Sequence, residues 1–213
     1  MSIITRKRPP ELEGRYVQRG TYQMTVSTGA VTLIAARTTT AGQLFTFRWG
    51  DTTGLHAYIR YVGAKFIATT AHSTAQETGC DLIIARAYTA TCTGGTAIDV
   101  GGTIPDSGQF MTNHPTSLLT SARVASTTAL TGGTYVLDAN PIAQCGGYTS
   151  AVGITVPPAP TKGQEVLFDA PGDESPLVLA QDEGFMIRNT IVMGTAGVGH
   201  WEFTVRWEEG TPG

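Results

Sequence analysis

Residues 200–208 read HWEFTVRWE, and this stretch decides the class of fold. Its apolar residues alternate with polar and charged ones, which is the two-residue period of a β-strand with one buried face. The apolar positions are Trp201, Phe203, Val205 and Trp207. A second stretch, GQLFTFRW at 42–49, alternates in the same way. It places Phe45, Phe47 and Trp49 on one face and Leu44, Thr46 and Arg48 on the other.

Outward from these two stretches, strand-sized segments are separated by turns that contain Gly, Pro or acidic residues. The further segments are 22–26, 30–37, 55–69, 80–88, 117–126, 135–138, 164–169, 177–180 and 185–193. No segment has the period of an amphipathic helix. The pattern therefore predicts an all-β fold, an antiparallel β-sandwich of jelly-roll type.

Glycines and irregular segments mark the breaks between these strands. Gly63 predicts a bulge or bend inside the segment 55–69. Gly146 and Gly147 predict a connector, and the proline-rich stretch 156–163 predicts a loop or linker. Residues 89–116 follow no period, and we expect so long a loop to be functional or ordered by a partner.

Composition excludes several classes of protein. Only 15% of the 213 residues are charged and 26 are Gly, which does not fit a coiled coil or a charge-driven disordered chain. The N-terminus lacks the apolar core of a signal peptide, and no apolar run is long enough to span a membrane. A surface with few charges is weakly protected against association, so we expect partners to cover part of it.

The net charge of -3 is the sum of opposed parts of the chain. Residues 1–19 hold five basic and two acidic residues, whereas residues 165–213 hold two basic and nine acidic ones. We expect residues 1–19 to form an extended basic arm and residues 20–213 to form a single β-sandwich domain. The arm contacts that we predict are Arg6, Lys7, Arg8, Pro9 and Pro10. The acidic partner surface that we predict on a neighbouring subunit is Asp173, Glu174, Glu208 and Glu209.

Catalytic and metal-binding patterns are weak throughout the chain. The four His are isolated, and no nucleophile or phosphate-binding motif is present. Three cysteines, Cys80, Cys92 and Cys145, suggest neither a disulfide framework nor a zinc site, and we expect reduced, buried thiols. A hard cation at the acidic turn around Asp173 is the weaker alternative to a solvated turn. We predict no enzyme, no cofactor and no metal site.

Several stretches resemble structural proteins of tailed-bacteriophage particles. They are PLVLAQDEGFMIRN at 176–189, GHWEFTVRWEE at 199–209, TSLLTSARVASTTALTGGT at 116–134, LDANPI at 137–142 and GQLFTFRW at 42–49. The first two resemble the terminal hairpin of such proteins. The resemblance implies a place in the virion, after synthesis in the cytoplasm of a host bacterium, without saying which place.

We therefore expect a virion structural protein, most simply a decoration or cement protein of the capsid. Its partners would be copies of itself, as a homo-oligomer, and other virion proteins, first of all the major capsid protein. We expect no membrane and no direct nucleic-acid binding. The aromatic residues predicted to anchor a core or an interface are Phe45, Phe47, Trp49, Trp201, Phe203 and Trp207. Two alternatives stay open: a tail, neck or baseplate protein, and a jelly-roll module that binds or hydrolyses carbohydrate.

Overall fold

A computed structural model describes residues 18–31, 36, 42–70, 77–100, 107–109, 115–148, 165–171, 175–192 and 198–212. These residues form thirteen β-strands and no helix, which confirms the all-β prediction. Accordingly, the described part of the chain offers no helix that could cross a membrane.

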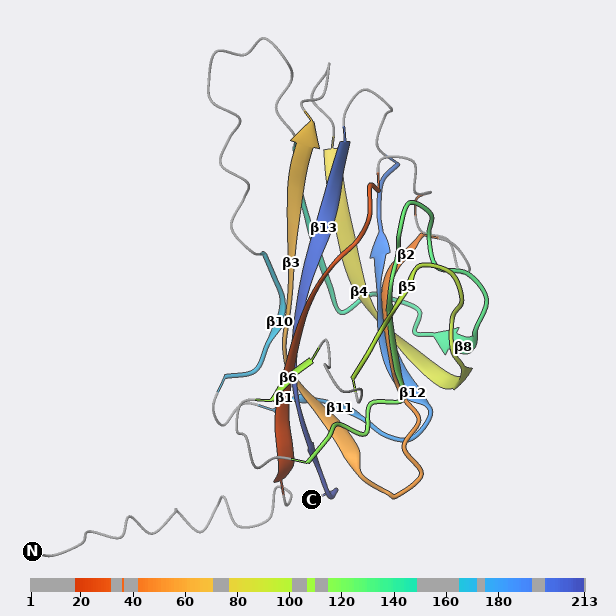
Figure 1. Cartoon of the computed structure of the whole chain (residues 1–213), viewed down its shortest axis with the longest axis vertical. Coiled ribbons are helices and arrows are strands. Elements are labelled where there is room, and N and C mark those ends of the chain that lie inside the picture. The colour runs from red at the N-terminus through yellow and green to blue at the C-terminus, as the bar shows by residue number, and fades with distance from the viewer. Residues whose placement is uncertain are drawn as a thin grey trace, which may run out of the picture.

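The strands form two antiparallel sheets (Figure 1). Sheet A has the order β10-β3-β13-β1-β6, and β11 also pairs with β3. Its strands are β1 (Gln18–Ser27), β3 (His56–Thr70), β6 (Ser107–Gln109), β10 (Glu165–Asp169), β11 (Leu177–Leu179) and β13 (Val198–Gly210). Sheet B has the order β5-β7-β2-β12-β4-β8, and β9 also pairs with β4. Its strands are β2 (Gln43–Trp49), β4 (Glu77–Ala90), β5 (Thr96–Ile98), β7 (Ser121–Val124), β8 (Thr134–Leu137), β9 (Ala143–Tyr148) and β12 (Glu183–Asn189).

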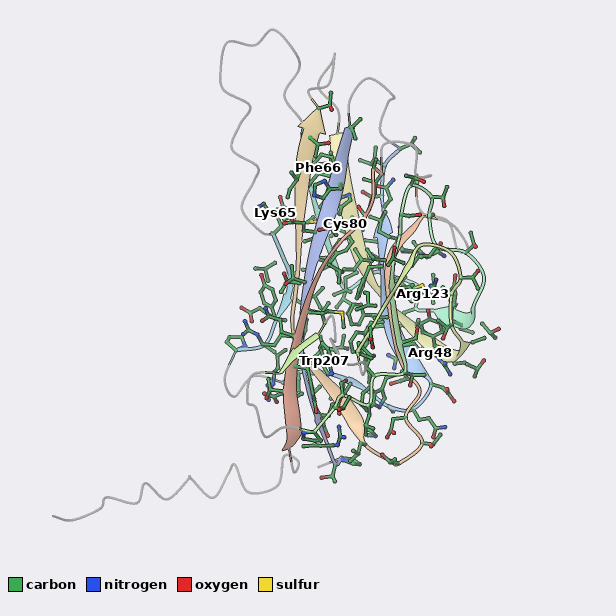
Figure 2. The ribbon with its side chains drawn as sticks, in the orientation of Figure 1. Arg48, Lys65, Phe66, Cys80, Arg123 and Trp207 are labelled. Carbon is green, nitrogen blue, oxygen red and sulfur yellow. The ribbon has the colours of Figure 1, made fainter. Side chains whose placement is uncertain are left out.

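One hydrophobic core fills the space between the sheets. The aromatic face of β2 meets the aromatic face of β13 there, as the alternation of both strands requires. The rings of Phe45 and Phe203 lie 5.9 Å apart, and Phe47 meets the edge of Trp207 at 5.4 Å. Figure 2 shows Trp207 between the two layers and Lys65 on the opposite side of β3 from the core. The two stretches with the clearest alternation therefore face each other across the core of the β-sandwich.

A second layer covers the outer face of sheet B, the face that carries Leu44, Thr46 and Arg48. Tyr88 hydrogen-bonds to the side chain of Thr46, and Gln43 Nε2 donates to Tyr135 Oη at 2.8 Å. A side chain at position 184 would meet the carbonyl oxygen of Phe47 on the paired strand and also the ring of Tyr88, so glycine lets both lie close. These groups come from the end of β4, from β8 and from the loops beside them, which fold back over this face; we call residues 86–95 and 125–137 the cover of sheet B. In Figure 1, β5 and β8 lie on the side of β2 and β12 that faces away from β13.

The glycine-based predictions need correction. Gly146 and Gly147 do not form a connector, because both lie within β9. A side chain at Gly146 would meet the carbonyl oxygen of Thr78 on the paired strand, so this glycine allows close pairing rather than a turn. The bulge predicted inside 55–69 is present, but it lies at Arg60, where β3 shifts register against β13 between Tyr61 and Ile59. Opposite Gly63 the irregularity lies on the neighbouring strand, where β10 shifts register between Val166 and Phe168.

The less regular predicted segments are only partly within the described residues. Of the predicted strand 30–37, positions 30, 31 and 36 are described and lie outside any strand. The predicted strand 117–126 is shorter, since β7 covers only Ser121–Val124. The long loop 89–116 contributes β5 to sheet B and β6 to sheet A, so its described parts are ordered within the chain. The possible linker 156–163 lies outside the described residues.

Candidate interaction surfaces

The six predicted aromatic anchors all lie in the core. Phe45, Phe47, Trp49, Trp201, Phe203 and Trp207 are at most 3% exposed. Trp49 is fixed further by its indole nitrogen, which donates to the carbonyl oxygen of Leu55 at 2.9 Å. The prediction left open whether these residues serve a core or an interface, and the structure places them in the core. They are therefore not the contact surface for another subunit.

Glu209 is buried at the end of β13, where the sequence led us to expect a surface acid. Its carboxylate forms an ion pair with Arg19 at 2.5 Å and accepts a hydrogen bond from Ser117 Oγ at 2.6 Å. It also accepts from the backbone N–H of Leu118 at 3.0 Å and from Trp207 Nε1 at 3.3 Å. These donors balance a charge that would otherwise be costly to bury. In this structure Glu209 joins β1, β13 and residues 115–118 of its own chain and is not available to the arm of a neighbour.

Tyr22 lies beside this carboxylate. Its ring stacks on Trp207 at 5.5 Å, and its hydroxyl donates to the carbonyl oxygen of Pro115 at 2.7 Å. Burial, followed by the nearby charge of Glu209, raises the pKa of Tyr22 to about 12. The hydroxyl therefore stays protonated at neutral pH. Its hydrogen bond to the carbonyl oxygen of Pro115 keeps that residue next to β1.

The other predicted contact residues are placed differently or lie outside the described residues. Glu208 accepts a hydrogen bond from Arg60 Nε at 3.1 Å on the outer face of sheet A. β1 begins at Gln18, so the described end of the predicted arm is already part of the sandwich. The residues outside the described ranges are Arg6, Lys7, Arg8, Pro9, Pro10, Asp173 and Glu174. The predicted contact between arm and acidic surface thus stays a prediction.

The outer face of sheet A is polar, and we call it the open face. Thr25 and Thr204 hydrogen-bond to each other through their hydroxyls at 3.2 Å on adjacent strands. Arg206 lies over the ring of Tyr61, 5.7 Å from its centre. The ion pair between Lys65 and Glu202 spans 3.9 Å, and both side chains are 34% exposed. The open face therefore combines hydroxyls with charged side chains that are paired or stacked within the chain.

The second candidate surface is the edge where the two sheets adjoin through β9 and β10. β8 and β9 lie end to end along β4, and β10 and β11 lie end to end along β3. The backbone N–H of Gly146 in β9 donates to the Glu165 carboxylate in β10 at 3.2 Å, which joins the two edges. We call these four strands the split edge. Its exposed apolar side chains are Val136, Val166 and Val178, and Ile142 is exposed between β8 and β9.

Sequence reasoning missed two side-chain pairs, one buried and one half-buried. Arg188 in β12 forms two hydrogen bonds with Asp81 in β4, at 3.0 and 2.8 Å, and both side chains are almost fully buried. Cys80 in β4 lies opposite Cys145 in β9, with the two sulfurs 3.0 Å apart. Their partners are 107 and 65 residues away in the chain, so no local spacing could have indicated either pair.

Within the described residues, no group of three or more His, Cys, Asp or Glu is placed to hold a metal ion. Comparison of the chain with protein-family models, curated proteins and solved structures finds no match.

Proposed function

We propose that the chain is a structural component of a tailed-phage particle, a capsid decoration or cement protein that acts through contacts between subunits. The order of the strands carries this proposal. Two places in the sheets are each filled by a pair of short strands that lie end to end. One pair is β8 and β9 along β4, and the other is β10 and β11 along β3. The main strands then follow the orders β1-β13-β3-β10 and β2-β12-β4-β9.

This order supports a jelly roll. Successive strands β1 to β4 alternate between the sheets, and the last strands β12 and β13 return to the middle of each sheet. Two facing sheets connected in this way are the arrangement of viral capsid domains and of lectins. Fold alone does not decide function, so the resemblance to phage structural proteins is the second support.

The distribution of charge fits a protein that works by assembly. Arg19, Arg48, Arg60, Arg86 and Arg188 all pair with acids of their own chain. The charges of the open face are likewise engaged within the chain, since Arg60 pairs with Glu208 and Lys65 with Glu202, so a partner could cover this face without burying an uncompensated charge. The split edge adds exposed valines on the outermost strands of both sheets, to which another chain could attach.

The test is the copy number of the chain in purified particles. Quantitative mass spectrometry of particles from the phage or lysogen that encodes the chain should give hundreds of copies per capsid. A count of only a few copies would move the chain to the tail, neck or baseplate. Absence from the particles would overturn the proposal.

The basic arm is tested by deletion of residues 2–14. We expect the truncated protein to fold but to bind particles more weakly than the full chain, because the arm orders on a neighbouring subunit. The matched control is Lys162→Ala, which removes a basic residue elsewhere in the chain. Unchanged binding of the truncated protein would show that the arm makes no contact.

A carbohydrate-binding module stays the second candidate, because lectins share the jelly-roll arrangement. The isolated protein would then bind immobilised bacterial glycans. Saturable glycan binding by the isolated protein, without incorporation into particles, would favour this candidate.

A further inference from the structure

Cys80 and Cys145 occupy directly opposite positions on two antiparallel strands. β4 and β9 pair from Glu77 with Tyr148 to Leu82 with Ala143, which aligns the two cysteines. The sulfurs approach to 3.0 Å, and both cysteines are free thiols. Figure 2 labels Cys80 on β4.

The backbone geometry suits a bond between these two sulfurs. Directly opposite residues of an antiparallel pair have Cα atoms about 4.5–5.5 Å apart and side chains on the same face. A disulfide needs Cα atoms roughly 4.4–6.8 Å apart. Closure therefore requires rotation of the side chains and no rearrangement of the strands.

The third cysteine is differently placed. Cys92 Sγ lies 3.2 Å from the hydroxyl of Tyr88 and 3.5 Å from the carbonyl oxygen of Gly132, within the cover of sheet B. Cys92 serves as an internal control, because it is a buried thiol engaged with other groups.

We propose that Cys80 and Cys145 form an intrachain redox pair that closes to a disulfide when the folded protein meets a small-molecule disulfide such as oxidised glutathione. Cys145 sulfur attacks one sulfur of oxidised glutathione, whose S–S bond breaks and releases one glutathione thiolate. Cys80 sulfur then attacks Cys145 sulfur and releases the second glutathione. Two protein thiols are oxidised, one glutathione disulfide is reduced to two thiols, and the two protein protons pass to the departing thiolates.

The order of attack follows from the burial of the two thiols. Cys145 is only partly buried, on strand β9 of the split edge, whereas Cys80 is completely buried. Burial, the hydrogen bond with Cys145 and the nearby acids raise the pKa of Cys80, so its thiol reacts poorly with an external disulfide. Once Cys145 carries the glutathione, Cys80 is the thiol within reach.

The disulfide would stabilise the part of the chain that contains the cover of sheet B. It closes a loop of the chain between residues 80 and 145, which contains β5, β6, β7 and β8. Cross-linking so long a loop restricts the unfolded chain and stabilises the folded one. The pair would stay reduced in a bacterial cytoplasm and close after release into an oxidising medium. This inference stands on the geometry of the pair and holds whether or not the proposed function is right.

The experiment uses the full-length folded protein, equilibrated with oxidised and reduced glutathione at graded ratios. The remaining thiols are alkylated under denaturing conditions, and intact mass and peptide mapping give the linkage. We expect wild type to lose two alkylation sites and to yield a peptide pair that joins Cys80 to Cys145. The melting temperature of the oxidised form should rise by roughly 5–10 °C over the reduced form.

Variants separate the two steps. Cys80→Ala should accumulate one glutathione on Cys145, because the resolving thiol is gone, and Cys145→Ala should stay unmodified at Cys80. Cys92→Ala is the matched control and should form the bond as wild type does. Three alkylated thiols in folded wild type at the most oxidising ratio, or a bond that includes Cys92, would overturn the proposal. If a variant does not fold, the alkylation and peptide mapping of the wild type still test the proposal.

Discussion

Sheet A leaves its outer face open to solvent, whereas sheet B carries a second layer of its own chain over the corresponding face. The difference is visible in the central strands. In β13 buried and half-exposed residues alternate, whereas in β12 every residue after Glu183 is buried. An antiparallel sheet with one solvated face shows clean alternation, and a sheet covered on both faces loses it. The two sheets thus have similar pairing but different surroundings.

The ion pairs on the two outer faces give the largest expected contrast. Asp81→Ala should lower the free energy of unfolding by about 3–5 kcal/mol, because it leaves the buried Arg188 guanidinium without its carboxylate. Glu202→Ala on the open face should change it by no more than about 0.5 kcal/mol, because its pair with Lys65 is exposed. Denaturant unfolding followed by circular dichroism measures both values.

A double variant keeps this test decisive if Asp81→Ala does not fold. Asp81→Leu with Arg188→Met removes both charges and should recover most of the lost stability. Equal effects of Asp81→Ala and Glu202→Ala would contradict the burial of the Asp81–Arg188 pair.

Truncation of an apolar residue beneath the cover should have the next largest effect. Leu44 lies on the outer face of sheet B and is fully buried. Leu44→Ala should cost about 2–4 kcal/mol through lost burial and a residual cavity. Thr204→Ala on the open face is the matched control, and its effect should stay within about 0.5 kcal/mol. A cost for Leu44→Ala as small as that of the control would mean that the cover is displaced in solution.

Alkaline pH should distinguish a buried tyrosine of the cover from one on the open face. Burial raises the pKa of Tyr88 above its usual value of 10, and burial also raises that of Tyr61. The unfolded chain loses each proton near pH 10 while the folded chain retains it, so stability is complete below pH 10 and falls as the pH rises further. We expect Tyr88→Phe to flatten this fall more than Tyr61→Phe does, in unfolding measured between pH 9 and pH 11. The reverse order would place Tyr88 in solvent.

The smallest expected effect concerns the residue where β4 bends away towards the cover. Ala87 has a φ of 46°, in the left-handed region that favours glycine. Ala87→Gly should therefore raise the free energy of unfolding by about 0.5–1 kcal/mol. Ala90→Gly, later in the same strand and without a positive φ, should lower it by a similar amount. Thermal unfolding of both variants tests the bend, and destabilisation by Ala87→Gly would contradict it.

The sequence predicted the fold where the evidence is local. The alternation at 42–49 and 200–208 located β2 and β13 and their aromatic faces, because successive side chains of a strand point to opposite sides. The same reasoning failed at Gly146 and Gly147, since glycine marks both turns and close strand pairing. It also assigned Glu209 to an acidic surface, because acids are in excess over residues 165–213 and a local count of charge does not show which of them is buried.

The candidate surfaces were much less predictable than the core. Residues 1–17 of the predicted arm and two of the four predicted acids lie outside the described residues. The split edge was not predicted, because its formation depends on β8 and β9 sharing β4 and on β10 and β11 sharing β3. Such sharing is a property of strand order, which hydrophobic period does not encode.

By itself, the sequence determined that this protein is built from strands and which side of its clearest strands is apolar. Only the tertiary structure decided that the outer face of sheet B is covered, that Glu209 is buried with Arg19 and that Cys80 faces Cys145. The physical reason is the separation of the interacting residues along the chain. A two-residue period can be recognised within a short stretch of sequence, whereas the burial of a polar side chain depends on donors and acceptors that only folding brings together.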